Sequence, residues 1–394
     1  MSTQESVALP PLVQPAAALT PEEMQRYSRH LIIPEVGLQG QLRLKNARVL
    51  VIGAGGLGSP AMLYLAAAGV GTIGIVDDDV VEASNLQRQV IHTVRDLGRS
   101  KAQSARDSIL DLNPGTAVVL HETRLDATNA LDIFAGYDVI LDGTDNFATR
   151  YLVNDAAAIL GKPYVWGSIL RFDGQVSVFW DRYGPNYRDL YPEAPPPGSV
   201  PSCAEGGVLG VLCAQIGSVM VNEAIKLITG IGTTLLGRVL VFNALQMSWR
   251  ELKVRKDPHG EPITKLADYE AFCGVGPAPV VDAGHTVSAT ELAGMLRSRD
   301  DGGASFELID VREPGEYEIV HIPGARLVPK GRILSGEAVG ELPRDKELIL
   351  HCKSGARSAE VLRDLLDHGY TKVRHLDGGV LAWVRDVEPE KAVY

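Results

Sequence analysis

The GAGGLG segment over residues 53–58 is the first that could do chemistry. It stands between an apolar run over 48–52 and a helical pattern, as in the G-x-G-x-x-G turn that joins a strand to a helix. Its backbone N–H groups can approach phosphates, and the helix N-terminus adds partial positive charge. Asp77 follows about 20 residues later, where a carboxylate can hold ribose hydroxyls. The segment predicts a nucleotide site formed by Gly53, Gly55, Gly56, Gly58 and Asp77.

Cations and a carboxylate further along favour a triphosphate in that site. Arg88 stands in SNLQRQ, and Lys101 opens the next expected helix. A dinucleotide offers two bridging phosphates, whereas ATP brings three and calls for cations and magnesium. Asp145, in GTDN at the end of an expected strand, can hold Mg²⁺ through one carboxylate and waters. Arg88 and Lys101 alone could be solvated surface charges, but the whole set favours ATP over NAD.

Cys352 marks a second candidate site, between a strand pattern ending in ELILHC and a helical pattern. In the loop CKSGARS the cysteine faces backbone N–H groups, and the helix dipole and Arg357 also favour an anionic sulfur. We expect a nucleophilic thiolate rather than an inert buried thiol. The loop between Cys352 and Arg357 is too short to enclose a phosphate, so it favours sulfur carried as a persulfide.

The composition limits the remaining possibilities. Of 394 residues, 45% are hydrophobic and 22% charged, which is typical of a soluble protein of two or three domains. The net charge of −11 gives no broad basic surface for nucleic acid or anionic lipid. Four cysteines with no Cys-x-x-Cys pair argue against a secreted, disulfide-built fold. The N-terminus lacks a signal-peptide pattern and no apolar run reaches about 20 residues, so we expect a cytoplasmic protein without a membrane span.

The elements that must position these residues begin at a helix with Thr20 as its cap and Glu23 completing a capping box. Strand and helix patterns then alternate, which predicts an α/β fold with a parallel sheet covered on both faces. The expected strands cover 48–52, 72–77, 116–121, 138–142, 163–169 and 174–180, the helices 57–69, 101–112 and 205–228, and a hairpin 238–254.

Four segments are expected along the chain. Residues 1–18 form a flexible tail, 19–255 the nucleotide-binding domain, 256–284 a linker with several proline breakers, and 285–394 a second, smaller α/β domain. In that domain the strands are expected at 306–311, 347–352 and 371–376.

The segments RYSRH, GAGGLG, SNLQRQ, GTDN and SCAEGGVLG, in this order over about 20–255, resemble the ubiquitin-activating-type adenylyltransferases. The nearest resemblance is to those of molybdopterin-synthase and thiamine sulfur carriers. It implies a Rossmann-like adenylation domain that uses ATP and Mg²⁺ to adenylate the terminal Gly-Gly carboxylate of a small ubiquitin-like sulfur-carrier protein. The residues it implies at the ATP site, besides the glycine loop and Asp77, are Ser84, Asn85, Leu86, Gln87, Arg88, Lys101, Asp145 and Asn146.

The same resemblance implies a homodimer in which Arg29 reaches the active site of the partner subunit. It also suggests that Cys203 bonds covalently to the activated carrier; the alternative is a thiol that only shapes its loop. Family members commonly bind zinc through two Cys-x-x-Cys pairs. Here the first pair falls on Asn186 and Asp189, and no cysteine stands over 254–263, so no zinc is expected.

The last 110 or so residues resemble a rhodanese through LIDVREPGEYEIVHIPGA, the Cys352 loop and HLDGGVLAW. This resemblance implies a persulfide on Cys352 and structural roles for Asp310, Arg312 and Arg357. The sulfur donor would be thiosulfate or the persulfide of a cysteine desulfurase.

Taken whole, the chain resembles the molybdopterin-synthase adenylyltransferase/sulfurtransferases, which implies an acyl-adenylate that the Cys352 persulfide converts to a thiocarboxylate. Two alternatives remain at this point: an NAD-binding oxidoreductase with a rhodanese domain, and a non-catalytic adaptor that presents Cys352.

Overall fold

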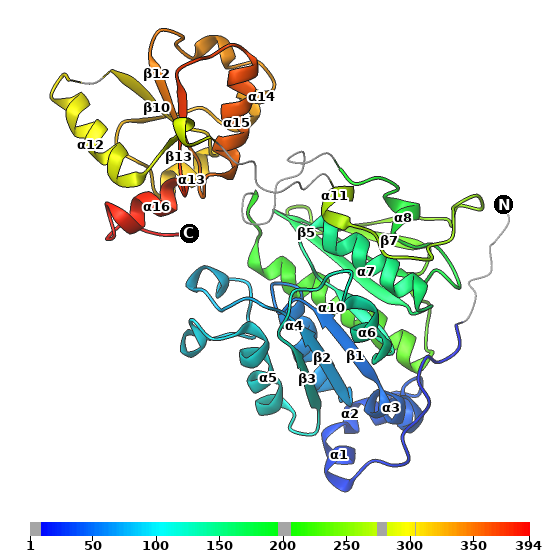
Figure 1. Ribbon diagram of the computed structural model, residues 1–394. Coiled ribbons are helices and arrows are strands. Elements are labelled where there is room, and N and C mark those ends of the chain that lie inside the picture. The colour runs from blue at the N-terminus through cyan, green and yellow to red at the C-terminus, as the bar shows by residue number, and fades with distance from the viewer. Residues whose placement is uncertain (1–8, 196–205, 274–281, 304) are drawn as a thin grey trace. The chain divides into compact units, whose positions relative to one another are not determined.

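The computed structural model describes residues 9–195, 206–273, 282–303 and 305–394 (Figure 1). The chain divides into two compact units, Met1–Val275 and Gly276–Tyr394. Tyr269 and Cys273, which lie in the segment expected as a linker, are buried in the core of the first unit. The short helix α11 (Tyr269–Phe272) carries them there.

The first unit is built on an eight-stranded sheet in the order β3-β2-β1-β4-β5-β6-β7-β8. The strands are β1 (Arg48–Ile52), β2 (Thr72–Val76), β3 (Ala117–His121), β4 (Val139–Asp142), β5 (Tyr164–Leu170), β6 (Asp173–Phe179), β7 (Arg238–Asn243) and β8 (Ser248–Lys253). The first five strands in this order pair in parallel, as expected. From β5 onward the pairing is antiparallel: the hairpin expected over 238–254 is present as β7 and β8, whereas the antiparallel pairing of β6 with β5 and β7 was not predicted. A tight turn at Arg171 joins β5 to β6, and so short a connection allows only an antiparallel pair.

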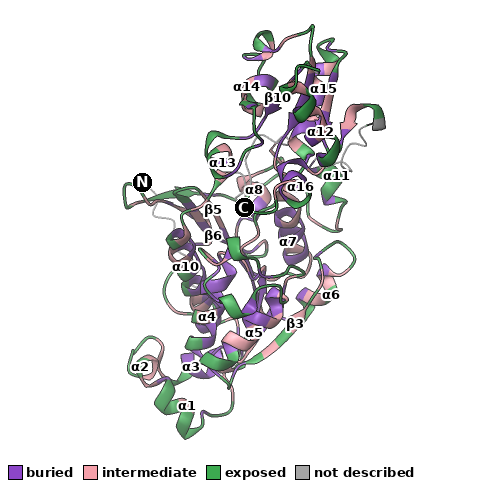
Figure 2. Ribbon diagram, turned by 90° about the vertical axis from the view of Figure 1, so that its left-hand side faces the viewer, coloured by how far each residue is buried: buried purple, intermediate pink, exposed green. Residues whose placement is uncertain are grey.

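Helices cover both faces of this sheet, and the strand residues alternate between two cores. Val49 and Val51 pack in one core with α3 (Gly37–Asn46), α4 (Gly58–Ala68), α5 (Lys101–Leu112) and α10 (Gly210–Thr229). Leu50 and Ile52 pack in the other with α6 (Ala130–Ala135), α7 (Phe147–Ile159) and α8 (Tyr187–Leu190). This alternation is what a strand buried on both faces requires. Figure 2 shows α4 and α7 largely in the buried colour and the edge strand β3 in the exposed and intermediate colours.

Two details of the helices bear on the expectations. The first helix, α1 (Pro21–Arg26), has the expected capping box between Thr20 and Glu23, and α2 (Ser28–Leu31) follows it. The helix expected from residue 205 begins at Gly210. By length and composition α10 could cross a membrane, although Glu223 and Lys226 interrupt its apolar residues. In the structure 56% of its most apolar stretch is buried, where it packs against α4 and the sheet.

The second unit has a parallel sheet in the order β11-β10-β12-β13-β9. Its strands are β9 (Thr286–Val287), β10 (Phe306–Asp310), β11 (Ala325–Leu327), β12 (Glu347–His351) and β13 (Val373–Leu376), so the three expected strands are present. Its helices are α12 (Ala289–Asp300), α13 (Pro314–Ile319), α14 (Lys330–Leu334), α15 (Ala356–Asp367) and α16 (Gly379–Asp386). Leu308 and Ile349 face one core, and Ile309 and Leu350 face the other.

Candidate active sites

A cavity of about 470 Å³ lies in the first unit where parallel strands end. The strands β1, β2 and β4 end at Ile52, Val76 and Asp142, and the residues that follow them line the cavity. Carboxyl ends of neighbouring parallel strands meet at one edge of a sheet, which is where α/β folds bind ligands. The predicted site residues in its wall are Gly53, Gly55, Gly56, Asp77, Arg88, Lys101, Asp145 and Asn146.

The glycine turn has the shape expected for a phosphate loop. Gly53 has φ +87°, which favours glycine. A Cβ on Gly58 would lie 1.9 Å from the Gly53 carbonyl oxygen, so Gly58 closes the turn at the N-terminus of α4 rather than lining the cavity. A Cβ on Gly56 would lie 2.8 Å from Cys213 Sγ, which lets α10 approach the turn. The turn therefore leaves its backbone open toward the cavity.

Asp77 faces the cavity and also holds this turn. Its Oδ2 accepts a hydrogen bond from the Ala54 N–H at 2.7 Å, and its Oδ1 accepts one from the Asp79 N–H at 2.9 Å. Burial raises the pKa of Asp77, and these two hydrogen bonds oppose the rise. The carboxylate thus has fixed geometry before any ribose arrives.

Cationic side chains line the cavity, and the fold holds each in place. Lys101 is buried at the start of α5, with Nζ 3.0 Å from Asp79 Oδ2. Arg88 donates from Nη1 to the Ser84 carbonyl oxygen at 3.0 Å. Because both side chains are oriented by neighbours, they supply positive charge at defined positions in the wall.

The sequence reasoning missed two further cations, Arg150 and Arg124. Arg150 is buried on α7, and its guanidinium donates to the Thr144 carbonyl oxygen at 2.9 and 3.1 Å. Arg124 lines the cavity and pairs with Glu270 at 2.6 Å. The GTDNFATR segment could have revealed Arg150, because a helix starting after GTDN brings an arginine one turn on back toward the strand end.

Four predicted residues, Ser84 to Gln87, shape the segment that carries Arg88. Among the described residues, the cavity wall does not include them. Asn85 is buried and accepts a hydrogen bond from the Glu82 N–H at 3.2 Å. A Cβ on Gly210 would lie 2.3 Å from the Gln87 carbonyl oxygen, so this segment also packs against the start of α10.

Asp145 and Asn146 stand exposed at the end of β4, on the cavity wall. Asn146 caps α7 by accepting from the Thr149 N–H at 2.8 Å. Asp142 fixes the loop from below, since its Oδ1 accepts from the Thr144 N–H and hydroxyl at 3.0 and 2.8 Å. Among the cavity carboxylates, Asp77 holds backbone and Asp79 holds Lys101. Asp78 and Asp145 also line the cavity, and carboxylate oxygens are the ligands that magnesium prefers.

The remaining predicted catalytic residues are not part of the cavity wall that the structure describes. Arg29 is exposed on α2 and does not line the cavity of its own chain over the described residues. Cys203 falls outside the described residues.

The positions that would carry the first zinc-binding pair of the family are joined by hydrogen bonds instead. Asn186 donates from Nδ2 to Asp181 Oδ1 at 2.8 Å, and Lys256 Nζ pairs with the same oxygen at 2.8 Å. Asp189 accepts from the N–H groups of Asn186 and Asp257 at 2.7 and 2.8 Å. These contacts tie residues 181–189 to 256–257. Over the described residues, no three His, Cys, Asp or Glu side chains gather as metal ligands do.

In the second unit, the loop that follows β12 places two hydrogen-bond donors near the sulfur atom of Cys352. Sγ accepts a hydrogen bond from the Gly355 N–H at 3.1 Å, and Ser358 Oγ lies 3.6 Å from it. Gly355 has φ +101°, which turns its N–H inward just before α15. The cysteine is buried, so these donors act in a place of low dielectric.

The Gly-Gly of HLDGG fixes the other side of this loop. The N–H groups of Val380 and Leu381 donate to the carbonyl oxygens of Cys352 and Lys353 at 2.8 and 3.1 Å. A Cβ on Gly379 would lie 2.5 Å or less from both oxygens. The motif is therefore needed so that α16 can begin directly against the cysteine loop.

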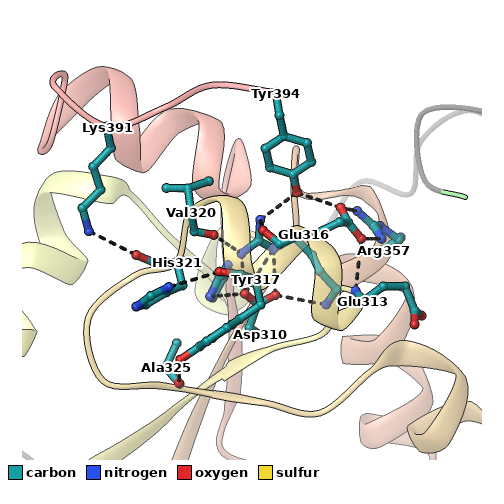
Figure 3. Close-up of polar contacts among 12 residues, drawn as sticks. Asp310, Glu313, Glu316, Tyr317, Val320, His321, Ala325, Arg357, Lys391 and Tyr394 are labelled. Atoms are coloured by element: carbon teal, nitrogen blue, oxygen red, sulfur yellow. Dashed lines mark hydrogen bonds and ion pairs between the residues drawn. The ribbon is translucent and has the colours of Figure 1, made fainter. Parts of the chain in front are cut away.

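Buried ion pairs lie behind the loop. Asp310 and Arg312 are both fully buried, with Oδ2 and Nη2 2.5 Å apart. Arg357 donates to both oxygens of Glu316 at 2.7 Å (Figure 3). The Arg357 guanidinium thus has a structural role, because its pair with Glu316 links α15 to α13. Burial lowers the pKa of His351, the residue before Cys352, to about 4, so its imidazole is neutral at pH 7.

Comparison with known proteins bears directly on these two sites. The ThiF family matches residues 27–263, and the Rhodanese-like domain matches residues 288–386. The chain is 62% identical to the probable adenylyltransferase/sulfurtransferase MoeZ of Mycobacterium tuberculosis, over 99% of this chain and 100% of that protein. It is 40% identical to the adenylyltransferase and sulfurtransferase MOCS3 of Drosophila grimshawi, over 95% of this chain and 87% of that protein.

Solved structures resemble the chain in fold. Crystal structures of Escherichia coli MccB include one with MccA-N7isoASN, at a TM-score of 0.55 and 20% identity, covering 60% of this chain and 74% of that one. PaaA gives a TM-score of 0.53 at 22% identity, covering 61% and 76%.

The chain therefore belongs to the ThiF family, among the members that carry a rhodanese-like domain after the adenylation domain. It is an enzyme of the adenylyltransferase and sulfurtransferase classes, as its full-length relatives are. Neither an NAD-dependent oxidoreductase nor a non-catalytic adaptor is favoured by these similarities.

Proposed function

We propose that the chain adenylates the C-terminal glycine of a small ubiquitin-like sulfur-carrier protein that ends in Gly-Gly, and then transfers sulfur to it from a persulfide on Cys352. The observation that carries this proposal is the pairing, in one chain, of a cation-lined cavity around a glycine turn with a loop whose N–H faces a cysteine sulfur. Neither site alone makes a thiocarboxylate.

In the first step the carrier carboxylate attacks the α-phosphorus of ATP. A phosphorus–oxygen bond forms, the bond to the β-phosphate breaks, and pyrophosphate leaves. The nucleophile is already ionised, so the protein needs no general base; it positions the groups and offsets charge. The glycine turn holds phosphate oxygens, and Arg88, Lys101 and Arg150 offset their charge. A magnesium ion at Asp145 would add charge neutralisation at the phosphates.

In the second step the terminal sulfur of the Cys352 persulfide attacks the acyl carbonyl. A carbon–sulfur bond forms and AMP leaves, which gives an acyl disulfide on Cys352. A thiol then attacks the Cys352 sulfur of that disulfide. The sulfur–sulfur bond breaks, the carrier leaves as a thiocarboxylate, and Cys352 is left in a mixed disulfide that a second thiol reduces. Cys203 or an external thiol can act here.

The persulfide itself is formed when the Cys352 thiolate takes sulfane sulfur from a donor. Thiosulfate or the persulfide of a cysteine desulfurase would supply it. The hydrogen bond from the Gly355 N–H fixes the position of the sulfur for this attack. We place the activity in the cytoplasm and in molybdenum-cofactor or related sulfur-transfer biosynthesis.

The adenylation unit is proposed to act as a homodimer in which Arg29 completes the cavity of the partner subunit. Its exposure on α2, away from its own cavity, agrees with that role. Mixing an Arg29→Ala chain with an Asp145→Ala chain should restore part of the activity that each lacks alone. Mixing that restores nothing would contradict the role of Arg29.

The decisive experiment supplies ATP, Mg²⁺, thiosulfate and a panel of Gly-Gly-ended carriers, and detects the carrier thiocarboxylate by mass spectrometry. Cys352→Ser should abolish thiocarboxylate formation but keep carrier-dependent ATP–pyrophosphate exchange. Asp145→Ala should abolish both. Cys273→Ser, at a buried cysteine that is not among the described residues of the cavity wall, is the control. Absence of exchange with every carrier, or a thiocarboxylate made by Cys352→Ser, would refute the proposal.

A further inference from the structure

The phenol of Tyr394 points into a polar cluster that also contains Asp310, Glu316 and Arg357 (Figure 3). Its hydroxyl donates to Glu316 Oε1 at 2.7 Å and accepts from Arg312 Nη1 at 2.7 Å. Burial raises the pKa of Tyr394, so the phenol stays neutral and keeps the one proton that this arrangement needs. The hydroxyl thus connects the Glu316 carboxylate to the Arg312 guanidinium.

The Arg312 guanidinium is held by several hydrogen bonds, so it fixes the position of the phenol. Besides Tyr394, the Arg312 guanidinium donates to both oxygens of Asp310 and to the carbonyl oxygens of Glu316 and Val320. Arg312 and Asp310 have no exposed surface. Arg312 therefore fixes the phenol of Tyr394, and the phenol in turn fixes the position of the Glu316 carboxylate.

From this support Tyr394 reaches the cysteine loop by two routes. Through Glu316 it orients the bidentate pair with Arg357, which lies in the first turn of α15. Through its ring it contacts Lys353, whose Nζ lies 4.5 Å from the ring centroid. The two routes meet the loop on either side of Gly355, whose N–H faces the sulfur.

We propose that Tyr394 is a positioning residue for sulfur transfer at Cys352, because it holds Lys353 and Arg357 so that the loop between them keeps the Gly355 N–H on the sulfur. This inference rests on the proposed role of Cys352 as the sulfur carrier. Tyr394 contacts neither sulfur nor donor directly. Its removal should therefore slow the sulfur step without weakening donor binding by the same factor.

The test uses the full chain and measures sulfur transfer from thiosulfate to cyanide. Tyr394→Phe keeps the ring over Lys353 and removes only the hydroxyl; we expect a fall in kcat of about tenfold with KM for thiosulfate changed less than twofold. That factor corresponds to about 1.4 kcal/mol in the barrier. Hydrogen exchange over residues 352–367 should rise in the same variant.

The matched control is Tyr370→Phe. This buried tyrosine of the same unit donates its hydroxyl to the carbonyl oxygens of Val339 and Leu342, away from the cluster. It should lower the unfolding midpoint at least as much as Tyr394→Phe does, yet keep kcat. Wild-type kcat in Tyr394→Phe, or an equal loss of kcat in both variants, would overturn the inference.

A second variant keeps the inference testable if Tyr394→Phe folds poorly. Glu316→Gln keeps an acceptor for the phenol but weakens the pair with Arg357, so it should lower kcat in the same way. If both residues act along one route, the double variant should lose no more than the worse single one. A folded Glu316→Gln with normal kcat would also overturn it. Cys352→Ser, inactive in the same assay, separates this failure from a failure of the proposed function.

Discussion

The cavity of the first unit gathers its polar groups from segments far apart in the sequence, from Gly53 to Arg150, whereas the groups around the Cys352 sulfur come from one loop. In the cavity the charges belong to long side chains such as Lys101 and Arg150, each held by a neighbour. At Cys352 the Gly355 backbone N–H donates a hydrogen bond to the sulfur, whereas the charged side chains of Glu316 and Arg357 pair with each other.

This difference follows from the ligands. Several phosphates and a metal need charge spread over a wide wall, so the fold must bring distant side chains together. One sulfur atom needs a few N–H groups at a fixed point, and a strand–loop–helix connection supplies them locally. Such a loop keeps its conformation only if neighbouring residues fix both of its ends.

The largest expected effect separates the two sites. Lys101→Ala removes a fixed cation from the cavity and should lower carrier-dependent ATP–pyrophosphate exchange by about 100-fold or more. It should leave thiosulfate-dependent sulfur loading of Cys352 unchanged. Lys45→Ala, which breaks a lysine–carboxylate pair at 2.7 Å elsewhere in the unit, is the control. Equal losses in both assays would mean that the sites are not chemically separate.

The next effect tests the support behind the cysteine loop. Asp310→Asn leaves the Arg312 charge buried without its partner and should destabilise the second unit by about 3–5 kcal/mol. Urea unfolding followed by hydrogen exchange of 306–312 measures it. Asp386→Asn, at the exposed pair with Arg385, should change stability little. If both variants behave alike, the buried pair is not the support we describe.

The pH dependence of the second unit should show the buried imidazole of His351. Its pKa is about 4 when folded, against 6.5 as the ordinary value. As pH falls, the unfolded chain takes up the proton first, so the stabilisation is complete above pH 6.5 and is lost down to about pH 4. The loss should be about 3 kcal/mol. Hydrogen exchange of 347–367 across this range should show it, and His351→Phe should flatten the difference; an unchanged slope would contradict it.

The smallest effect concerns the glycine turn. Gly58→Ala places a Cβ against the Gly53 carbonyl oxygen, a backbone atom that cannot move aside, and should cost about 2 kcal/mol. Gly55→Ala, whose Cβ would meet nothing closer than 3.8 Å, should keep the thermal midpoint. A thermal scan compares them. Equal midpoints would show that the turn adapts more freely than its geometry indicates.

Local patterns predicted much of this structure. The runs at β1, β2, β4 and β12 were predicted as strands, because each is short and mostly apolar and is bounded by turn residues. The β7–β8 hairpin was predicted, but the antiparallel pairing of β5 with β6 was not, since the turn at Arg171 carries neither glycine nor proline at that point. The resemblance to rhodaneses implied structural roles for Asp310, Arg312 and Arg357, but Glu316 and Tyr394 were not predicted, because they meet Arg312 only through packing.

The sequence by itself determined the glycine turn, the order of strands and helices and the cysteine at a strand–helix junction, because these depend on neighbours along the chain. Only the tertiary structure decided that Arg150 and Arg124 also line the cavity, which residue Arg357 pairs with and what holds Tyr394. Those depend on side chains from separate elements, and their positions follow from the packing of whole sheets and helices rather than from local preference.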